Sequence, residues 1–330
     1  MQGLNIEHID FRNPTDLYDW NNFVDNNNGS CFNYLEWQKI LSKSYNAKPV
    51  NLMIKEKNNV IGIVCGYFTE SNKFFFIKKG IFGSGAQFHN YLSNFLINDL
   101  GYKDQYSISF SIKTSVILDV IKGEESVWSE LRRETRKDIK KGIKKNLFIG
   151  EGWDFLDQFY TVYVENMMQK NALIHSKKYF IQLSKNLGKK ASLFVVIDGS
   201  EVISGIIVLY SKSIAELYIG AWNRKFANKS PYSFMYWHAI TDAINKGIKM
   251  IDMGESTKGS GTYKYKVNFG GNPVNTEYAS IEKKNSEIQA NNRFARLFIS
   301  NGLKLILSLK FFSKLKYFYL IRSRKNNKIV

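Results

Sequence analysis

The residues best suited to chemistry lie near the end of the chain, between Gly254 and Gly271. This stretch is rich in glycines, hydroxyl side chains and lysines, and it follows an apolar run, 250–253, that has the pattern of a buried strand. The glycines keep the backbone flexible, while the lysines supply positive charge at the end of the strand. We therefore expect this stretch to hold an anionic substrate or to stabilise an oxyanion that develops during a reaction.

Two acidic residues, Asp252 and Glu255, flank the predicted end of this strand. Either carboxylate is suited to accept a proton from an amine or to bind sugar hydroxyls. For Asp252 we favour the alternative, a structural role in which the carboxylate bonds the local backbone. If the following segment is extended, Lys264 and Lys266 share one side of it and the two tyrosines beside them face the other. A solvated surface lysine is the alternative for both.

His238 lies in the middle of a predicted helix, beside Trp237. It is a candidate for substrate binding, although a packed or surface histidine is the more common interpretation of such a position. The four histidines and two cysteines show no metal-ligand spacing, so we expect no metal. The sequence contains neither a nucleophile elbow of the Gly-x-Ser-x-Gly type nor a Walker-type phosphate loop.

The elements that would position these residues occur twice. Each half has a predicted β-hairpin, a third strand, a helix and a last strand. In the first half these are 50–55 with 60–68, then 74–77, 89–100 and 107–110. In the second they are 192–197 with 202–210, then 215–220, 232–246 and 250–253. Helices at 35–44, 155–169 and 178–187 precede the hairpins. The repeat indicates a duplicated α/β fold, with coincidence between two generic α/β halves as the alternative.

Between the halves, residues 126–145 keep an apolar stripe at four-residue spacing, which predicts one amphipathic helix. The other faces of this helix carry eight cations against three acidic residues. One interpretation is a solvated face with ion pairs between neighbouring turns. The other is an anion-binding wall that faces a cleft between the halves. The residues themselves leave both open.

The composition of the chain limits its class and its partners. With 330 residues, 44% of them hydrophobic, the chain is long enough for two domains with large cores. Its net charge of +18 favours anionic partners such as nucleic acid, phosphates or anionic lipid. Cys31 and Cys65 are expected to be buried thiols in a reducing compartment. No signal peptide and no apolar stretch of about 18 residues is present, so we expect a cytoplasmic protein without a membrane span.

Three motifs, in this order, carry a resemblance to a known family. The linker helix has a Trp-x-x-Leu-x-x-x-x-Arg pattern followed by lysines, at Trp128, Leu131, Arg136, Lys140, Lys141 and Lys144. A middle run spans 230–240, 245–247 and 251–254. The closing motif contains Gly259, Gly261, Tyr263, Tyr265, Lys266, Phe269 and Gly270. Over roughly residues 20 to 280 the chain resembles the Fem-type branch of the GNAT acyltransferase superfamily. It is most similar to GNAT-like proteins encoded with bacterial surface-polysaccharide genes.

The resemblance implies a fold and an activity. The fold would be α/β (α+β), with two tandem GNAT-like domains built on mixed sheets. The N-terminal domain is expected at 1–118 and the catalytic domain, opening with the linker helix, at 119–285, followed by a tail at 286–330. The activity would be transfer of an acyl or aminoacyl group to an amine. Acyl-CoA or aminoacyl-tRNA would be the donor, and an amino sugar or a lipid-linked envelope precursor would be the acceptor.

The resemblance also implies which residues form the site. Lys266 matches the lysine of the family's closing motif, so we expect it to stabilise the carbonyl oxygen during acyl transfer. The other catalytic candidates are Lys264, Glu255 and Asp252. The candidates for substrate binding are Arg136, Lys140, Tyr232, His238, Gly259, Gly261 and Tyr263.

The chain departs from the family pattern at two places. Related sequences often have arginine at the position of Glu255, which argues against a phosphate clamp there. The pyrophosphate loop of ordinary GNAT proteins contains glycines and should lie between the strand at 215–220 and the following helix. Here that segment, 223–230, contains no glycine. The usual CoA site is therefore not evident in the sequence.

The tail has a composition of its own. After Glu287 it contains no acidic residue, and lysines and arginines interrupt its leucines and aromatic residues. A basic, aromatic-rich helix of this kind suits the anionic cytoplasmic face of a membrane, and docking onto the protein itself is the alternative.

Three functions remain in competition. The leading one is a cytoplasmic N-acyltransferase that uses acyl-CoA and acts on an amino sugar, free or lipid-linked. The second is an aminoacyl-tRNA-dependent transferase, whose basic linker helix would bind tRNA phosphates. The third is a non-catalytic nucleic-acid- or membrane-binding protein. The sequence does not fix the acyl group, the acceptor or the oligomeric state.

Overall fold

The computed structural model describes residues 4–9, 13–68, 74–83 and 106–283, all within a single compact unit that spans 1–285. The predicted helix at 89–100 and the predicted tail at 286–330 lie outside the described residues. In the described part of the chain, no helix is long and apolar enough to cross a membrane.

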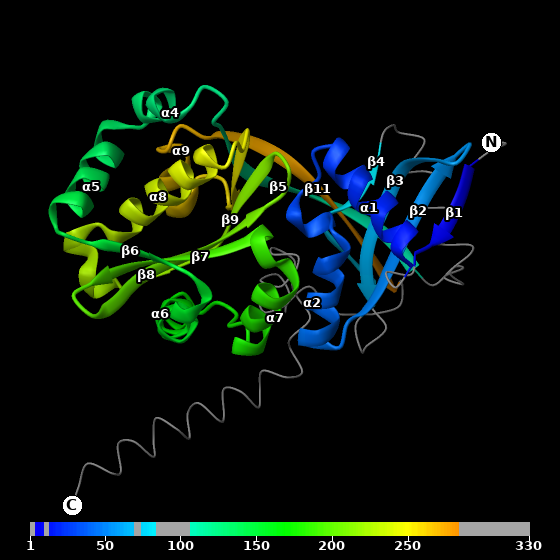
Figure 1. The fold of residues 1–330 in the computed structure, drawn as a ribbon, viewed down its shortest axis with the longest axis horizontal. Coiled ribbons are helices and arrows are strands. Elements are labelled where there is room, and N and C mark those ends of the chain that lie inside the picture. Colours follow the sequence, from blue (N-terminus) through cyan, green and yellow to red (C-terminus); the bar gives the residue numbers. More distant parts are fainter. Residues whose placement is uncertain (1–3, 10–12, 69–73, 84–105, 284–330) are drawn as a thin grey trace, which may run out of the picture. The chain divides into compact units, whose positions relative to one another are not determined.

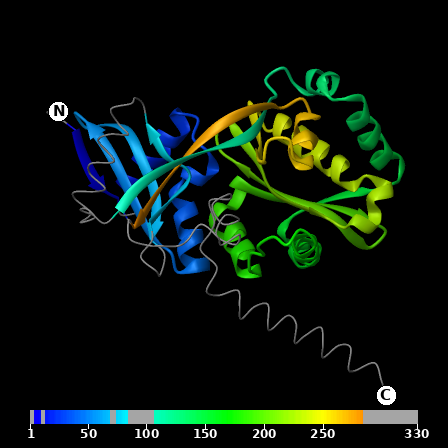
Figure 2. The same ribbon diagram turned by 180° about the vertical axis from the view of Figure 1, so that it is seen from behind.

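The described strands form one sheet, in the order β1-β2-β3-β4-β11-β5-β10-β9-β8-β7-β6. Their bounds are β1 Leu4–His8, β2 Lys48–Glu56, β3 Asn59–Phe68, β4 Phe74–Gly83, β5 Tyr106–Asp119, β6 Phe148–Glu151, β7 Ala191–Asp198, β8 Glu201–Tyr210, β9 Ile214–Trp222, β10 Met250–Glu255 and β11 Asn272–Lys283. Figure 2 shows β5 and β11 side by side as two long strands that run from one half of the sheet into the other.

Helices flank the sheet. They are α1 Pro14–Asn26, α2 Leu35–Tyr45, α4 Glu124–Glu130, α5 Arg133–Lys144, α6 Leu156–Gln169, α7 Lys177–Leu187, α8 Pro231–Asn245 and α9 Gly261–Val267, with short 3-10 turns η1 Cys31–Asn33, η2 Trp153–Phe155, η3 Gly188–Lys190 and η4 Arg224–Lys229. In the second half, α8 and α5 cover one face of the sheet, and α6 and α7 lie on the other (Figure 1).

The predicted duplication is visible in the strands. β2, β3 and β4 form an antiparallel meander, and so do β7, β8 and β9. In the second half β10 lies directly beside β9 and runs parallel to it. In the first half β5 also runs parallel to β4, but β11 lies between them and pairs antiparallel with both. The sequence analysis did not predict β11, because its alternating polar residues lack a continuous apolar run.

The linker prediction was wrong in one respect, because residues 126–145 form two helices, α4 and α5. The backbone is extended at Leu131 and Arg132, and the Arg132 N–H donates to the Asn268 carbonyl at 3.0 Å. The guanidinium of Arg136 donates to the carbonyl of Leu131 and to two further carbonyls at the end of α4. These hydrogen bonds satisfy backbone groups that the break between α4 and α5 leaves without helical partners. The apolar stripe stays buried through Leu131 and Ile139.

The closing motif forms a helix, α9, whereas the sequence analysis considered an extended segment there. Ser260 is the N-cap of α9, and its hydroxyl accepts a hydrogen bond from the Tyr263 N–H. Residues two apart on a helix differ by about 200° in direction. Lys264 is therefore exposed while Lys266 is buried, and the two lysines do not share a face.

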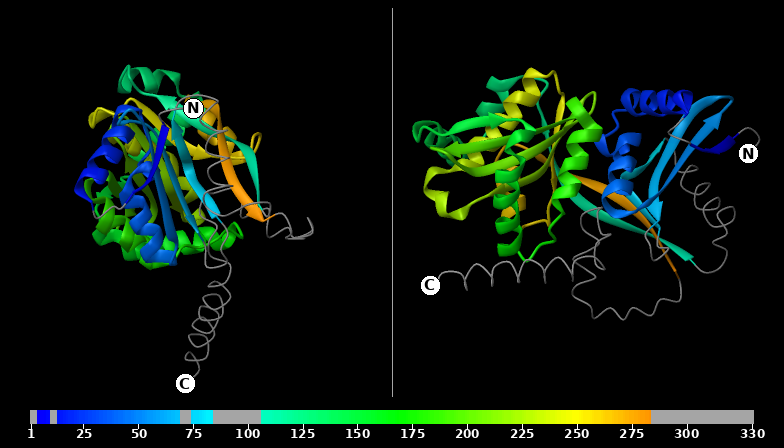
Figure 3. Two further views of the ribbon diagram at one scale, coloured as in Figure 1. Left: turned by 90° about the vertical axis from the view of Figure 1, so that its right-hand side faces the viewer. Right: turned by 60° about the horizontal axis from the view of Figure 1, so that its bottom comes forward.

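The two halves meet where α2 and α7 lie side by side (Figure 3). The Tyr45 hydroxyl lies 2.8 Å from His175 Nδ1, and Lys43 Nζ donates to Asn186 Oδ1. Both cysteines are buried, as predicted. Burial raises the pKa of the Cys65 thiol to about 12, so it stays protonated in the neutral range.

Candidate active site

A β-bulge shapes the end of β10. Pairing with β5 is regular up to Asp252 and shifts before it resumes at Glu255. Between them Gly254 has φ +82°, a conformation that L side chains rarely adopt. Asp252 Oδ1 accepts the Gly254 N–H at 2.8 Å and so helps to hold the bulge. The Asp252 carboxylate thus bonds the local backbone, which is the role we favoured from the sequence.

The bulge provides two carbonyls to Lys266. Nζ of Lys266 donates to the Gly254 carbonyl at 2.9 Å and to the Glu255 carbonyl at 3.1 Å. Lys266 is only 6% exposed. Burying an ammonium group costs much free energy unless hydrogen bonds satisfy it. The two carbonyls fix the position of Nζ, and a Cβ atom at Gly254 would lie 3.4 Å from it.

Lys266 lies where two parallel strands separate. β9 and β10 pair from Met250 to Asp252 on β10, opposite Ile214 to Glu216 on β9. β9 then continues to Trp222 without a β10 partner in the register. Ligands of open α/β sheets bind at the carboxyl ends of parallel strands. The lysine is therefore at the end of the sheet where a substrate is expected.

Three carboxylates lie on the strands at this point. Glu216 is 2% exposed, and its Oε2 accepts the Cys31 N–H at 3.2 Å. Asp252 is 1% exposed, whereas the side chain of Glu255 is 11% exposed and lies 3.2 Å from Lys113 Nζ. The sequence analysis missed Glu216 and Lys113. A glutamate inside the apolar run of β9 was the available signal for Glu216, and β5 offered none for Lys113.

A cluster of tyrosines packs beside α9. The Tyr232 hydroxyl donates to the Tyr236 hydroxyl at 3.1 Å, and the Tyr265 hydroxyl lies 3.1 Å from Ser233 Oγ. Burial raises the pKa of all three phenols, Tyr232, Tyr236 and Tyr265. These groups therefore remain protonated in the neutral range. Tyr232, a predicted substrate-binding residue, thus belongs to a buried aromatic cluster near the strand ends.

Three further predicted residues make contacts with other parts of the fold. His238 packs against Phe194, with ring centroids 5.1 Å apart, and burial lowers its pKa. Arg136 uses its guanidinium on the end of α4, as described above. Lys140 is exposed, with Nζ 5.9 Å from the centre of the Trp128 ring.

Of the two predicted glycines, Gly259 lies in the turn between β10 and α9, and Gly261 begins α9. Gly259 has φ +83°, and Gly261 is the first residue of α9, where neither would bring a Cβ atom into contact with other atoms. Tyr263 is partly buried against the core, and Lys264 is exposed. Their roles in substrate binding or catalysis stay predictions.

The segment between β9 and α8 would have to hold the phosphates of an acyl-CoA donor. It lacks glycine, but Arg224 and Lys225 are exposed in η4. The N-cap of α8, Ser230, makes no capping hydrogen bond, because its hydroxyl donates to Asp138. The two exposed cations of η4 suit a phosphate group, whereas the Asp138 carboxylate at the N-cap of α8 opposes one there. In the described part of the chain, no three His, Cys, Asp or Glu residues are grouped to hold a metal ion.

Comparison with known proteins agrees with this architecture. A family model described as an acetyltransferase (GNAT) domain matches residues 129–267. FemX, a solved structure, is 13% identical with a TM-score of 0.67 over 83% of this chain and 96% of its own. A tandem GNAT protein from the clavulanic acid biosynthesis pathway is 6% identical with a TM-score of 0.54, covering 85% of this chain and 98% of its own.

A protein of unknown function from Bacteroides thetaiotaomicron is 10% identical with a TM-score of 0.52, covering 84% of this chain and 99% of its own. No curated protein matches the sequence. At these identities the structural likenesses establish the fold, two tandem GNAT-like halves. The matched residues 129–267 include Glu216, Glu255 and Lys266.

Proposed function

From the match of residues 129–267 to an acetyltransferase (GNAT) domain, we propose that this chain is an N-acyltransferase. It moves an acyl group, acetyl or similar, from acyl-CoA to the amine of an amino sugar or related envelope precursor in bacterial surface-polysaccharide biosynthesis. The observation that supports this proposal most is the buried Lys266 ammonium, held by two carbonyls where β9 and β10 separate.

The site supplies what acyl transfer to an amine requires. The acceptor amine must lose a proton, and the carbonyl oxygen must be stabilised as it becomes negative. Lys266 serves the oxygen. Glu255 serves the amine, because its side chain is half-buried whereas Asp252 and Glu216 are buried.

A donor and acceptor screen tests the proposal. Purified full-length protein would be incubated with acetyl-CoA and a panel of amino-sugar nucleotides, and thiol release and product mass would be followed. We expect acetyl transfer to at least one free amine, with no transfer to the N-acetylated form of the same sugar. Thiol release without a product, or no reaction with any acyl-CoA, would contradict the proposal.

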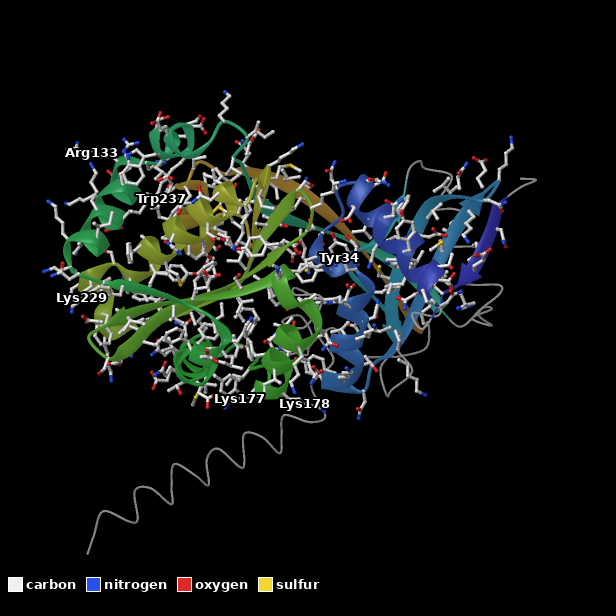
Figure 4. The ribbon with its side chains drawn as sticks, viewed as in Figure 1. Tyr34, Arg133, Lys177, Lys178, Lys229 and Trp237 are labelled. Carbon is white, nitrogen blue, oxygen red and sulfur yellow. The ribbon has the colours of Figure 1, made fainter. Side chains whose placement is uncertain are left out.

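The outer face of α5 favours a second candidate function, transfer from aminoacyl-tRNA. Its cations occupy positions that share a face of the helix, at Arg133, Lys137, Lys140 and Lys144. All four are exposed, and in the described part of the chain none is in an ion pair. Arg133 is labelled on this helix in Figure 4. A row of unpaired cations suits a phosphate backbone.

A salt series separates the two donors. If tRNA binds α5, a Lys137→Ala and Lys144→Ala double variant should weaken tRNA binding, and the salt slope of log K should fall by about 2, since each lost phosphate contact removes about 1. Acetyl-CoA turnover should not change. Equal tRNA affinity and slope for the double variant and the unmodified protein would exclude this face as a tRNA site.

For the tail we propose peripheral binding to an anionic membrane, on the cytoplasmic side. The proposal rests on its basic and aromatic sequence, with each cation near the surface contributing about 1 kcal/mol. Deletion of 292–330 should abolish flotation with anionic vesicles while activity on a water-soluble acceptor survives. Partial flotation should persist at high salt because the apolar side chains are not screened. If the full-length chain stays off the vesicles, or the deletion unfolds the protein, the proposal fails.

A further inference from the structure

An ion pair joins β5 to the end of β10. Lys113 Nζ lies 3.2 Å from Glu255 Oε2, and the two side chains are 14% and 11% exposed. Glu255 lies opposite Ser115 in the strand register, and Lys113 is two residues further along β5. The two side chains are thus diagonal neighbours on one face of the sheet. Lys113 comes from a part of β5 that lies outside the matched domain, 129–267.

A gain in stability does not by itself explain why Lys113 and Glu255 form this ion pair. Removing two charges from water costs about as much as their attraction returns, so a nearly buried ion pair is weak evidence for a stabilising role. This pair also lies one residue from the bulge, and the Glu255 carbonyl accepts a hydrogen bond from Lys266. A change in the conformation of Glu255 therefore affects its own carboxylate and the position of Lys266 Nζ, which are the two groups to which the proposed function assigns chemistry.

We propose that Lys113 is a positioning residue, which holds the Glu255 carboxylate ionised and directed at the acceptor amine. The inference rests on the proposed function. In the step concerned, a proton moves from the ammonium nitrogen of the acceptor to a carboxylate oxygen of Glu255. The nitrogen keeps its electron pair and forms the N–C bond to the acyl carbon, while the C–S bond of the thioester breaks and its electron pair leaves on the CoA sulfur. The nitrogen then loses its second proton, which protonates the CoA thiolate, and Glu255 releases the first proton to solvent.

Other charged groups lie on the elements beside Glu255. Lys266 on α9 donates to the Glu255 carbonyl, and Asp252 on β10 is the register partner of Glu216 on β9. Lys258 and Lys264, in the turn after β10 and on α9, are exposed. Lys113 Nζ is in contact with the carboxylate itself. An adjacent cation favours the ionised form of a carboxylate. Loss of Lys113 should therefore let Glu255 take up a proton at a higher pH, which removes the active form from the acid side of the pH range.

A double-mutant cycle tests this inference. Acetyl transfer from acetyl-CoA to the amino-sugar nucleotide selected by the screen would be measured for Lys113→Met, Glu255→Gln, both together and Lys113→Arg. Loss of a general base costs roughly 10²–10⁴-fold, so Glu255→Gln should fall in that range. Lys113→Met should lose on the order of tenfold or more, but almost nothing further in the Glu255→Gln background, because residues that act as a unit are not additive.

The pH profile adds a reading that a merely structural role would not change. In Lys113→Met the acid limb of kcat/KM should move to higher pH by about 1 unit, and Lys113→Arg should restore it. The matched control is Lys55→Met, which breaks the Lys55–Glu7 pair of β2 and β1, 2.7 Å long, without affecting activity. Circular dichroism and thermal unfolding would check the fold of each variant.

The outcomes are distinct. If the unmodified protein transfers no acyl group, the proposed function fails and the inference fails with it. If it transfers acetyl but Lys113→Met and Glu255→Gln are additive, or if the acid limb does not move, Lys113 has no positioning role and the proposed function stands. Non-additive losses with a shifted limb support the inference.

Discussion

Replacement of Lys266 by alanine should reduce turnover by on the order of a hundredfold at saturating donor. One lost oxyanion-type contact is worth roughly 2.7–4 kcal/mol of transition-state stabilisation. In this site the ammonium is buried and fixed by the carbonyls of Gly254 and Glu255, so it is already oriented before a substrate arrives. Steady-state kinetics on the folded variant measure the effect, and KM should change much less than kcat.

Lys264→Ala tests the other candidate lysine of α9 under the same conditions. It removes the same side chain two residues away, at an exposed position. Because this side chain faces solvent, we expect a much smaller loss of turnover than for Lys266→Ala and no change in stability. Should Lys266→Ala keep the turnover of the unmodified protein while remaining folded, Lys266 is a structural residue and the oxyanion assignment is wrong.

The second large effect concerns stability. Phe269 is fully buried, and its ring contacts Tyr236 and Tyr265 at centroid distances of 5.7 and 5.2 Å. Phe269→Ala should lower the free energy of unfolding by about 3–5 kcal/mol, the usual cost of such a cavity. Because Phe269 lies two residues after the end of α9, the loss should also loosen the helix that carries Lys266. Urea unfolding followed by fluorescence measures the change.

Phe148→Ala provides the comparison, since Phe148 on β6 is 65% exposed. Its free energy of unfolding should stay within about 0.5 kcal/mol of that of the unmodified protein. A loss below about 1 kcal/mol for Phe269→Ala would contradict the prediction. It would mean that the surrounding aromatic rings move into the space left by the side chain.

Much of the fold could be predicted because its signals are local. The hairpins that became β2–β3 and β7–β8 have apolar runs joined by short turns at Lys57–Asn58 and Asp198–Ser200. The apolar stripe of the linker marked Leu131 and Ile139 as buried, and they are. The same stripe could not show the break between α4 and α5, because that break depends on a carbonyl of Asn268, more than 130 residues away along the chain.

For the candidate site, the sequence by itself determined the region and one residue. The closing motif and its resemblance selected Lys266 and the end of the 250–253 strand. Which way the lysines point, however, depends on whether the motif is a helix or a strand, and both are compatible with its glycines and hydroxyls. The Ser260 cap selected the helix and so separated Lys264 from Lys266.

The tertiary structure alone decided the chemistry around Lys266. Glycine permits a positive φ at many positions, but only the pairing of β10 with β5 places the bulge at Gly254 and brings two carbonyls to Nζ. Glu216 and Lys113 come from other strands, and neither has a sequence neighbour that indicates its role. Their positions follow from strand register, which is a long-range property set by the packing of the whole sheet.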